Sequence, residues 1–202
     1  VVASELSDQL KNDPDYQARI RQRDADVEVT IAQAKVEQKP ILDALRDIGV
    51  DVETIWSQNL SSKLSKEAVD ILVKHLTLPY SEGTREGLAR ALGNPLSKRY
   101  WHILVSEYRN AQVVIDNESI RNGYKEGLAC TIAMLVTTDT LDEYIDLVRD
   151  KSNGRSRILL LSALRRSRDP RAKKALEDLI DDPDLSKEIA AWKRQQEKKN
   201  IR

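Results

Sequence analysis

The stretch Arg85-Glu86-Gly87-Leu88-Ala89 recurs almost unchanged as Lys125-Glu126-Gly127-Leu128-Ala129. Aligning Leu88 and Leu128 with Leu160 and Ala190 extends the same register, at spacings of 40, 32 and 30 residues. Such spacings are typical of proteins built from repeated helical units. The residue three positions before each of these anchors is basic in every case: Arg85, Lys125, Arg157 and Lys187.

Turn signals around the anchors divide the chain into helical patterns, as at Gly93-Asn94-Pro95 and Asp169-Pro170. The patterns fall at about 64–77, 82–93, 96–110, 120–137, 140–151, 154–168, 170–182 and 184–198. They form four helix pairs, at about 64–95, 96–138, 140–168 and 170–198. A long polar connection at 110–119 departs from the pattern, so we expect the second pair to be distorted there.

The region before residue 62 shows no such repeat. Apolar residues at helical spacing predict a long amphipathic helix over 13–38, begun by Asp13-Pro14 and broken at Lys39-Pro40. A second short helix is predicted over 41–48, ending at Gly49. The polar stretch 57–62 marks a soft boundary, which predicts an N-terminal helical region at 1–62 and a repeat array at 63–202.

Composition limits the class of protein. The chain has 33 Lys+Arg against 33 Asp+Glu, so no net field draws the whole molecule to nucleic acid or to an anionic membrane. One cysteine, Cys130, suits a reducing compartment, and we expect a cytoplasmic protein. We expect neither a secretion signal nor a transmembrane span. The chain begins at Val1 rather than Met, so we expect its natural start to lie upstream.

The last two pairs resemble the HEAT and HEAT-like (phycobilisome-lyase-type) repeat families, and residues 40–94 resemble bacterial HEAT-repeat proteins. Ser167-Arg168-Asp169-Pro170-Arg171-Ala172 opens one helix, and Asp181-Asp182-Pro183-Asp184 turns into Lys187-Glu188-Ile189-Ala190-Ala191. The resemblance covers about 64–198. It implies an all-α fold, a right-handed α-solenoid of four antiparallel helix pairs preceded by the N-terminal helical region. It says little of function, because such repeats serve many unrelated roles.

Helical phase predicts an outward stripe on the second helix of each pair, the face that commonly lines the concave binding surface of a solenoid. The stripe mixes apolar and polar side chains, which suggests a protein interface. The alternative is that a neighbouring helix, or the N-terminal one folding back, covers it. The predicted protein-binding residues are Gly87, Arg90, Gly127, Cys130, Met134, Leu159, Ser162, Arg166, Ile189 and Trp192, with Gln196 at the end of the stripe.

The recurring basic position invites a second reading, as a ladder that binds phosphates. Phase argues instead for structure, because Arg157 falls on the side of Leu160 and can reach the preceding turn or an acid such as Asp150. The resembled family also uses a repeated Asp and Arg as a ladder between repeats. A separate basic run between 149 and 174 is locally positive, and its candidate anion-binding residues are Arg155, Arg165 and Arg166.

Signals for an enzyme are weak. His75 and His102 lack the spacing of a metal site, so no metal and no cofactor is predicted. Cys130 has no nearby His in the sequence and suits a buried thiol better than a nucleophile. HEAT-like alkylpurine DNA glycosylases use aromatic residues on a basic concave surface. The aromatic residues that suggest them here look like packing for the helix at 96–110: Tyr100, Trp101 and Tyr108.

The sequence therefore leads to three functional hypotheses. The first is a non-enzymatic protein–protein interaction module, with an immunity or antitoxin-type protein that masks a partner protein as one subclass suggested by family analogy. The second is a nucleic-acid-binding HEAT-like protein, including a relative of the DNA-repair glycosylases. The third is a scaffold subunit whose stripe is covered by its own copy.

Overall fold

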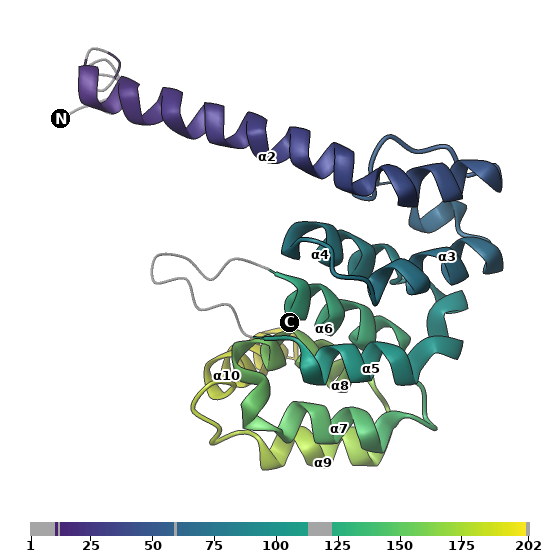
Figure 1. Ribbon diagram of the computed structural model, residues 1–202. Coiled ribbons are helices and arrows are strands. Elements are labelled where there is room, and N and C mark those ends of the chain that lie inside the picture. Colours follow the sequence, from purple (N-terminus) through teal and green to yellow (C-terminus); the bar gives the residue numbers. More distant parts are fainter. Residues whose placement is uncertain (1–10, 12, 59, 113–122, 201–202) are drawn as a thin grey trace. The chain divides into compact units, whose positions relative to one another are not determined.

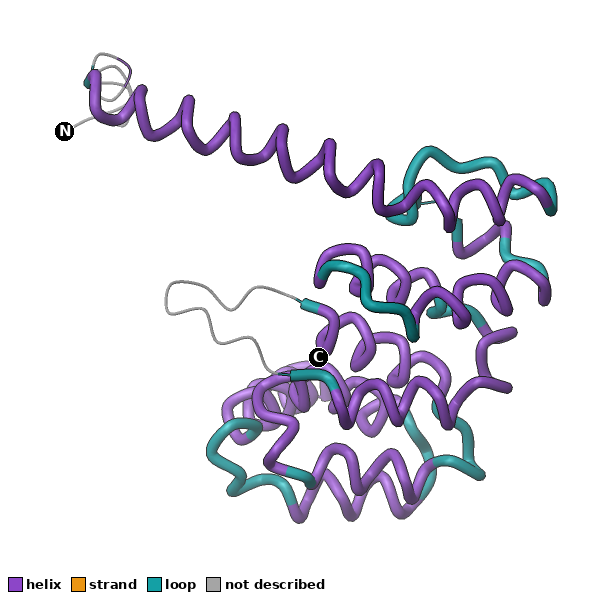
Figure 2. The backbone as a smooth tube through the Cα atoms, in the orientation of Figure 1, coloured by secondary structure: helices purple, strands orange, loops and turns teal. Residues whose placement is uncertain are grey.

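The computed structural model describes residues 11, 13–58, 60–112 and 123–200, with side chains for all of these but 61 and 196–200. Throughout these ranges the regular secondary structure is helical and contains no strand, as Figure 2 shows. The predicted all-α class is confirmed. Most of the polar connection expected at 110–119 lies outside the described residues.

The chain divides into two compact units, Val1–Pro40 and Ile41–Arg202. The division lies upstream of the soft boundary near residue 62, because the intervening residues belong to the core of the second unit. Ile41, Leu45, Ile55 and Leu60 are all buried there. Where the repeats begin remains a prediction.

Helix α2 (Pro14–Asp47) runs from the first unit into the second. The predicted start is confirmed, because the Asp13 carboxylate accepts hydrogen bonds from the backbone N–H groups of Asp15 and Tyr16 at 2.9 and 3.1 Å. The predicted break at Pro40 is wrong. Proline removes one helical hydrogen bond and crowds the preceding turn, but the turns after it are held by the fully buried side chains of Ile41 and Leu45.

The end of α2 follows the sequence. Gly49 adopts φ +82°, a left-handed conformation that favours glycine. Its N–H donates to the carbonyl of Arg46 at 2.9 Å, and Val50 N–H donates to Leu45 at 2.9 Å. These two bonds form a Schellman motif that satisfies the last carbonyls of the helix.

In its described residues the second unit is built from α-helices, and three of the connections between them contain 3-10 turns. Seven of the eight predicted helical patterns each contain one of the observed α-helices, and the eighth, at 184–198, overlaps α10, which continues to residue 200 (Figure 1). The α-helices are α3 (Lys66–Leu76), α4 (Glu82–Ala91), α5 (Trp101–Asn110), α6 (Tyr124–Leu135), α7 (Leu141–Arg149), α8 (Arg157–Arg166), α9 (Pro170–Asp178) and α10 (Ser186–Asn200). The 3-10 turns are η1 (Ser61–Lys63), η2 (Pro95–Tyr100) and η3 (Lys151–Ser156).

The helices of the second unit stack in succession. Helix α4 packs against α6, and α6 packs against α8, so these three form a continuous layer. Helices α3, α5 and α7 each pack against the next helix in the chain, and α9 packs against both α7 and α8. Figure 1 shows the same succession from α3 to α10.

The repeat register coincides with the core of this layer. Leu88 of α4, Leu128 of α6 and Leu160 of α8 are each fully buried. Ala190, the fourth anchor, lies on α10 and is half-buried. The internal similarity therefore marks equivalent core positions on three successive helices, and the equivalence weakens at the last.

Candidate binding surface

Three members of the predicted outward stripe do not face outward. Gly87, Gly127 and Ile189 are buried. A Cβ at Gly87 would lie 2.6 Å from Cδ1 of Ile55, and one at Gly127 would lie 3.2 Å from the carbonyl oxygen of Glu86. The prediction that these three residues are accessible is wrong.

The error has a physical cause. Helical phase separates one face of a helix from the other, but α6 has α4, α5 and α8 as neighbours and so is covered on several sides. The glycines lie where backbones or side chains approach too closely for a larger residue. Their recurrence in both copies of the repeated stretch was a signal for close helix packing.

Other stripe residues remain accessible and connect neighbouring helices. Arg90 Nη1 lies 3.9 Å from the Sγ of Cys130, so α4 meets α6. Arg166 Nη2 donates to the Ala133 carbonyl at 3.3 Å, so α8 meets α6. Met134 and Arg166 are exposed, and Arg90, Cys130 and Trp192 are half-buried. We call this set the exposed stripe: Arg90, Cys130, Met134, Arg166 and Trp192.

Among the described residues of the second unit, Met134 is the most exposed large apolar side chain, at 61%. Its sulfur would lie 3.1 Å from a Cβ at Gly93, so its thioether end lies beside the turn that follows α4. Trp192 of α10 is half-buried, and the guanidinium of Arg165 stacks 4.8 Å from its ring centre. Exposed Met, Arg and Trp side chains are enriched at protein interfaces.

The two remaining stripe residues contribute less. Leu159 and Ser162 are both half-buried on α8. Leu159 packs against the core, and the Ser162 hydroxyl donates to its carbonyl at 3.0 Å. The side chain of Gln196 lies outside the described residues.

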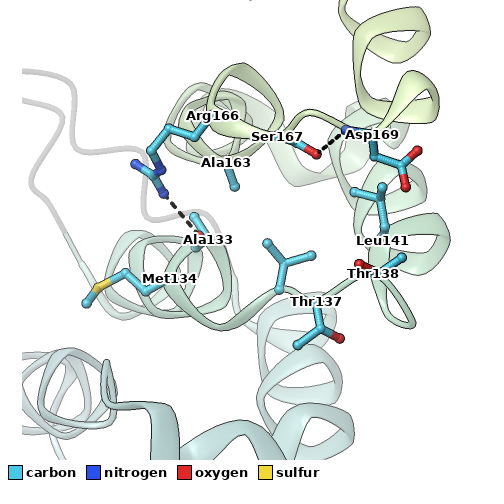
Figure 3. Close-up of a pocket in the computed structure, with 10 residues that line it drawn as sticks. Ala133, Met134, Thr137, Thr138, Leu141, Ala163, Arg166, Ser167 and Asp169 are labelled. Atoms are coloured by element: carbon cyan, nitrogen blue, oxygen red, sulfur yellow. Dashed lines mark hydrogen bonds between the residues drawn. The ribbon is translucent and has the colours of Figure 1, made fainter.

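A pocket of about 340 Å³ opens beside the exposed stripe, between the ends of α6 and α8 and the starts of α7 and α9. Figure 3 shows Arg166 and Met134 on the same side of it, with Ala133 and Ala163 between them and the centre. Its lining combines small apolar side chains, hydroxyls and two charged groups: Ala133, Met134, Val136, Thr137, Thr138, Leu141, Ala163, Arg166, Ser167 and Asp169.

The two charged groups of the pocket differ in their partners. Arg171 donates to both oxygens of Asp169, from Nε at 3.1 Å and from Nη2 at 2.9 Å. These bonds, together with one from the Arg171 backbone N–H, lower the pKa of the Asp169 carboxyl below its ordinary value. Arg166 forms no ion pair with any residue that the structure describes, and it donates to Ala133 alone.

The three candidate anion-binding residues do not form one cluster. All three are exposed, but Arg155 precedes α8 while Arg165 and Arg166 end it. A helix of this length rises about 15 Å between its ends. The structure therefore brings Arg165 and Arg166 together and leaves Arg155 apart.

Much of the surrounding basic run is paired with acids. Arg149 bonds Asp178 at 2.9 Å, and Arg171 bonds Asp142 at 2.7 Å. Lys174 lies 3.3 Å from Asp178. The positive charge of the run is thus balanced at Arg149, Arg171 and Lys174 but not at the three candidate anion-binding residues, which form no ion pair with the residues that the structure describes.

The recurring basic position is structural at three of its four members. Arg157 is fully buried and bonds both oxygens of Asp182, at 2.8 Å from Nη2 and 3.0 Å from Nη1. Its expected partner Asp150 instead accepts from the backbone N–H of Ser152 at 2.9 Å. The interpretation as structure holds, with Asp182 in place of Asp150 as the acid.

Arg85 and Lys125 serve the same purpose with other partners. Arg85 of α4 bonds Glu107 of α5 at 2.8 Å, and its guanidinium stacks 3.8 Å from the ring centre of Tyr124. Lys125 of α6 donates to the Ala111 carbonyl at 3.0 Å, and burial lowers the pKa of its ammonium. The fourth member, Lys187, is exposed.

Glu86 of the repeated stretch is a buried acidic residue. Its side chain is buried between α4 and α6 and accepts from Arg90 at 2.8 Å. Burial raises the pKa of the Glu86 carboxyl despite that ion pair. The Arg90 head is thereby held over the α4–α6 boundary, next to Cys130.

The residues considered for chemistry have structural partners. Trp101 is buried and donates to Glu143 at 2.7 Å, and Tyr108 is fully buried against the Ser156 hydroxyl at 2.7 Å. Tyr100 donates to Asp70 at 2.6 Å. His75 Nδ1 lies 2.7 Å from the Tyr80 hydroxyl. Among the described residues, no group of three or more His, Cys, Asp or Glu side chains is placed to hold a metal ion.

No protein-family model matches this chain, and neither a similar curated protein nor a similar solved structure was found. In the part of the chain that the structure describes, no helix combines the length and the apolar character needed to cross a membrane.

Proposed function

We propose that this protein is a HEAT-like α-solenoid that acts in the cytoplasm as a non-enzymatic protein-binding module. The solenoid is supported by the repeat register, which places Leu88, Leu128 and Leu160 at equivalent buried positions. It is also supported by Arg85–Glu107 and Arg157–Asp182, which link one helix pair to the next at separations of 22 and 25 residues.

The observation that carries the binding function is the exposed stripe. It crosses α4, α6, α8 and α10, and its side chains are of types that dominate binding energy or adapt to a partner. The layer beneath it is closely packed, as at Gly127. A rigid base of this kind limits the ordering cost of binding to the side chains of the stripe. Masking of a partner, as by an immunity or antitoxin-type protein, is one subclass of this function.

The test is affinity capture with the full chain, comparing wild type with a Met134→Glu, Arg166→Glu double variant. We expect a protein partner to be retained by the wild type and lost by the double variant. Arg155→Glu is the matched control, because Arg155 is exposed but lies at the opposite end of α8. A wild-type chain that captures no protein yet binds DNA tightly would overturn the proposal.

The alternative is a nucleic-acid-binding protein, and one observation favours it. Arg165 and Arg166 are exposed and form no ion pair with the described part of the chain, so they could meet phosphates. This reading predicts DNA affinity that falls steeply with salt. It also predicts a further fall when Arg155, Arg165 and Arg166 are reversed in charge. Affinity that is unchanged by these reversals would rule it out, together with a glycosylase-like role.

The third candidate is a scaffold subunit whose stripe is covered by a second copy. The exposure of Met134, at 61%, is the observation in its favour. Sedimentation equilibrium of the full chain tests it, because it requires a dimer or larger species that Met134→Glu dissociates.

A further inference from the structure

The pocket between α6, α7, α8 and α9 has the size of a ligand site. Its volume of about 340 Å³ lies at the lower end of the range for small-ligand pockets, about 300–1,000 Å³. That volume admits one side chain together with a neighbouring backbone segment. It does not admit a helix, so any macromolecule must enter it with a short stretch of chain.

The floor of the pocket suits an aliphatic group. Ala133 and Ala163 are small, and with Leu141 they are buried in the core beneath the opening. Small side chains at these places leave the space that a larger residue would fill. An aliphatic side chain of a ligand would therefore bury its surface against them at about 25 cal/mol per Å².

Of the two charged groups that line the pocket, Arg166 is the one left to pair with a ligand. Asp169 is already paired with Arg171 through both of its oxygens, and Arg171 also bonds Asp142 at 2.7 Å. Arg166 uses one of its N–H groups on Ala133 and, within the described residues, has no acid beside it. Because a guanidinium has five N–H donors in a planar fork, most of its capacity remains free for a carboxylate.

A carboxylate fits better than a phosphate backbone. Nucleic-acid sites draw on several cations to neutralise successive phosphates, but Arg155 lies at the other end of α8 and Arg165 is stacked on Trp192. A polar sugar–phosphate chain would also gain nothing from burial against the apolar floor. Met134, on the same side as Arg166 in Figure 3, offers a polarisable thioether that adapts to a protein partner.

We propose that this pocket is a specificity site for an acidic segment of a partner protein, with an Asp or Glu side chain on Arg166 and an adjacent aliphatic residue on the Ala133–Ala163 floor. The proposal rests on the protein-binding function and deepens it. Arg166 then fixes the orientation of the segment, and the floor supplies the burial.

The test uses isotope-labelled full chain and a synthetic peptide, N-acetyl-Gly-Leu-Glu-Leu-Gly-amide, followed by nuclear magnetic resonance. We expect saturable shifts at the Met134 methyl and at Arg166 Nε–H. The peptide with Gln in place of Glu should bind about tenfold more weakly, the loss expected for one hydrogen bond to a charged group.

Two variants distinguish the loss of the Arg166 charge from a loss of folding. Arg166→Gln should weaken the Glu peptide about tenfold and leave the Gln peptide unchanged, because it keeps a donor for the Ala133 carbonyl. Arg168→Gln is the matched control, since Arg168 is exposed two positions along the chain but does not line the pocket. Backbone spectra that match the wild type show that both variants are folded.

Three results overturn the proposal: equal affinity for the Glu and Gln peptides, equal weakening by both variants, and shifts with inorganic phosphate but not with the peptide. Failure of the proposed function is distinguishable, because affinity capture would then return no protein. If a captured partner dissociates from the Arg166→Gln variant no faster than from the Arg168→Gln variant, this inference is wrong and the proposed function still stands.

Discussion

Helices α2 and α6 are both regular, yet they are held by different forces. In α2 every residue from 21 to 33 is exposed, whereas nine of the twelve residues of α6 are buried. The exposed part of α2 is supported by local contacts, such as the 2.8 Å bond from Gln22 to Asp26. Since isolated helices are only marginally stable in water, α2 depends on propensity and α6 on packing.

The apolar residues of α2 sharpen the contrast. Val27 and Ile31 are about half exposed, at 49% and 50%, and Val29 and Val36 are exposed on the opposite side, at 56% and 76%. Within its own unit this helix therefore buries neither of two apolar faces. In the second unit, by contrast, apolar side chains fill the core. Substitutions of apolar residues in the two regions should therefore lower the free energy of unfolding by very different amounts.

The largest effect is expected at the buried ion pair. Asp182→Ala leaves the fully buried Arg157 guanidinium without its main partner, which should cost about 3–5 kcal/mol in the free energy of unfolding. Denaturant unfolding followed by tryptophan fluorescence measures it, because Trp56, Trp101 and Trp192 all lie in the second unit.

The control for that pair is Asp184→Ala. Asp184 lies 3.5 Å from Arg157 but is 47% exposed, so its loss should cost less than about 1 kcal/mol. Replacing both partners, as Arg157→Met with Asp182→Leu, should recover most of the stability. Equal losses for the two aspartates would contradict the assigned ion pair.

A slightly smaller loss in the free energy of unfolding is expected when a core side chain is shortened. Leu128→Ala removes a fully buried side chain from α6 and should cost about 2–5 kcal/mol. Ile31→Ala, in the exposed part of α2, should change the same tryptophan-detected free energy by less than about 0.5 kcal/mol. A large effect of Ile31→Ala would break the comparison, since it would mean that α2 contributes to the core.

Two glycines of the second unit should respond in opposite directions. Gly127→Ala places a Cβ 3.2 Å from the Glu86 carbonyl and should cost about 1–3 kcal/mol. Gly83→Ala, in the first turn of α4, meets no atom within 4 Å and should stabilise by about 0.5–1 kcal/mol. Thermal unfolding of the two variants measures the direction of each stability change. A Gly127→Ala variant as stable as the wild type would argue against close packing of α4 on α6.

The smallest effect is expected just above pH 10, where the free energy of unfolding begins to fall. Burial raises the pKa of the Tyr108, Tyr124 and Tyr144 hydroxyls above the ordinary value of 10.0. A raised folded-state pKa gives stability that is fully present below pH 10 and is lost as the pH rises beyond it. Unfolding free energies measured at successive pH values should therefore decline above pH 10. Tyrosinate absorbance that rises fully before unfolding would contradict the burial of these rings.

Much of the helical structure of the described residues could be predicted from the sequence. The Asp13 cap, the end of α2 at Gly49 and the positions of eight helices depend on local preferences that a short window of sequence contains. The buried positions Leu88, Leu128 and Leu160 followed from internal similarity. Pro40 shows the limit, because the burial of Ile41 and Leu45 outweighs its local tendency to break a helix.

The candidate site was predicted only in part, for the same reason. Met134 and Arg166 are accessible as expected, while Gly87 and Gly127 are buried by neighbours that helical phase cannot reveal. The sequence alone determined the helices, their order and their repeat register, because these depend on contacts within a few residues. The tertiary structure alone decided that Arg157 meets Asp182, which face of α6 stays open, and that a pocket forms beside Arg166, because each depends on contacts between distant segments.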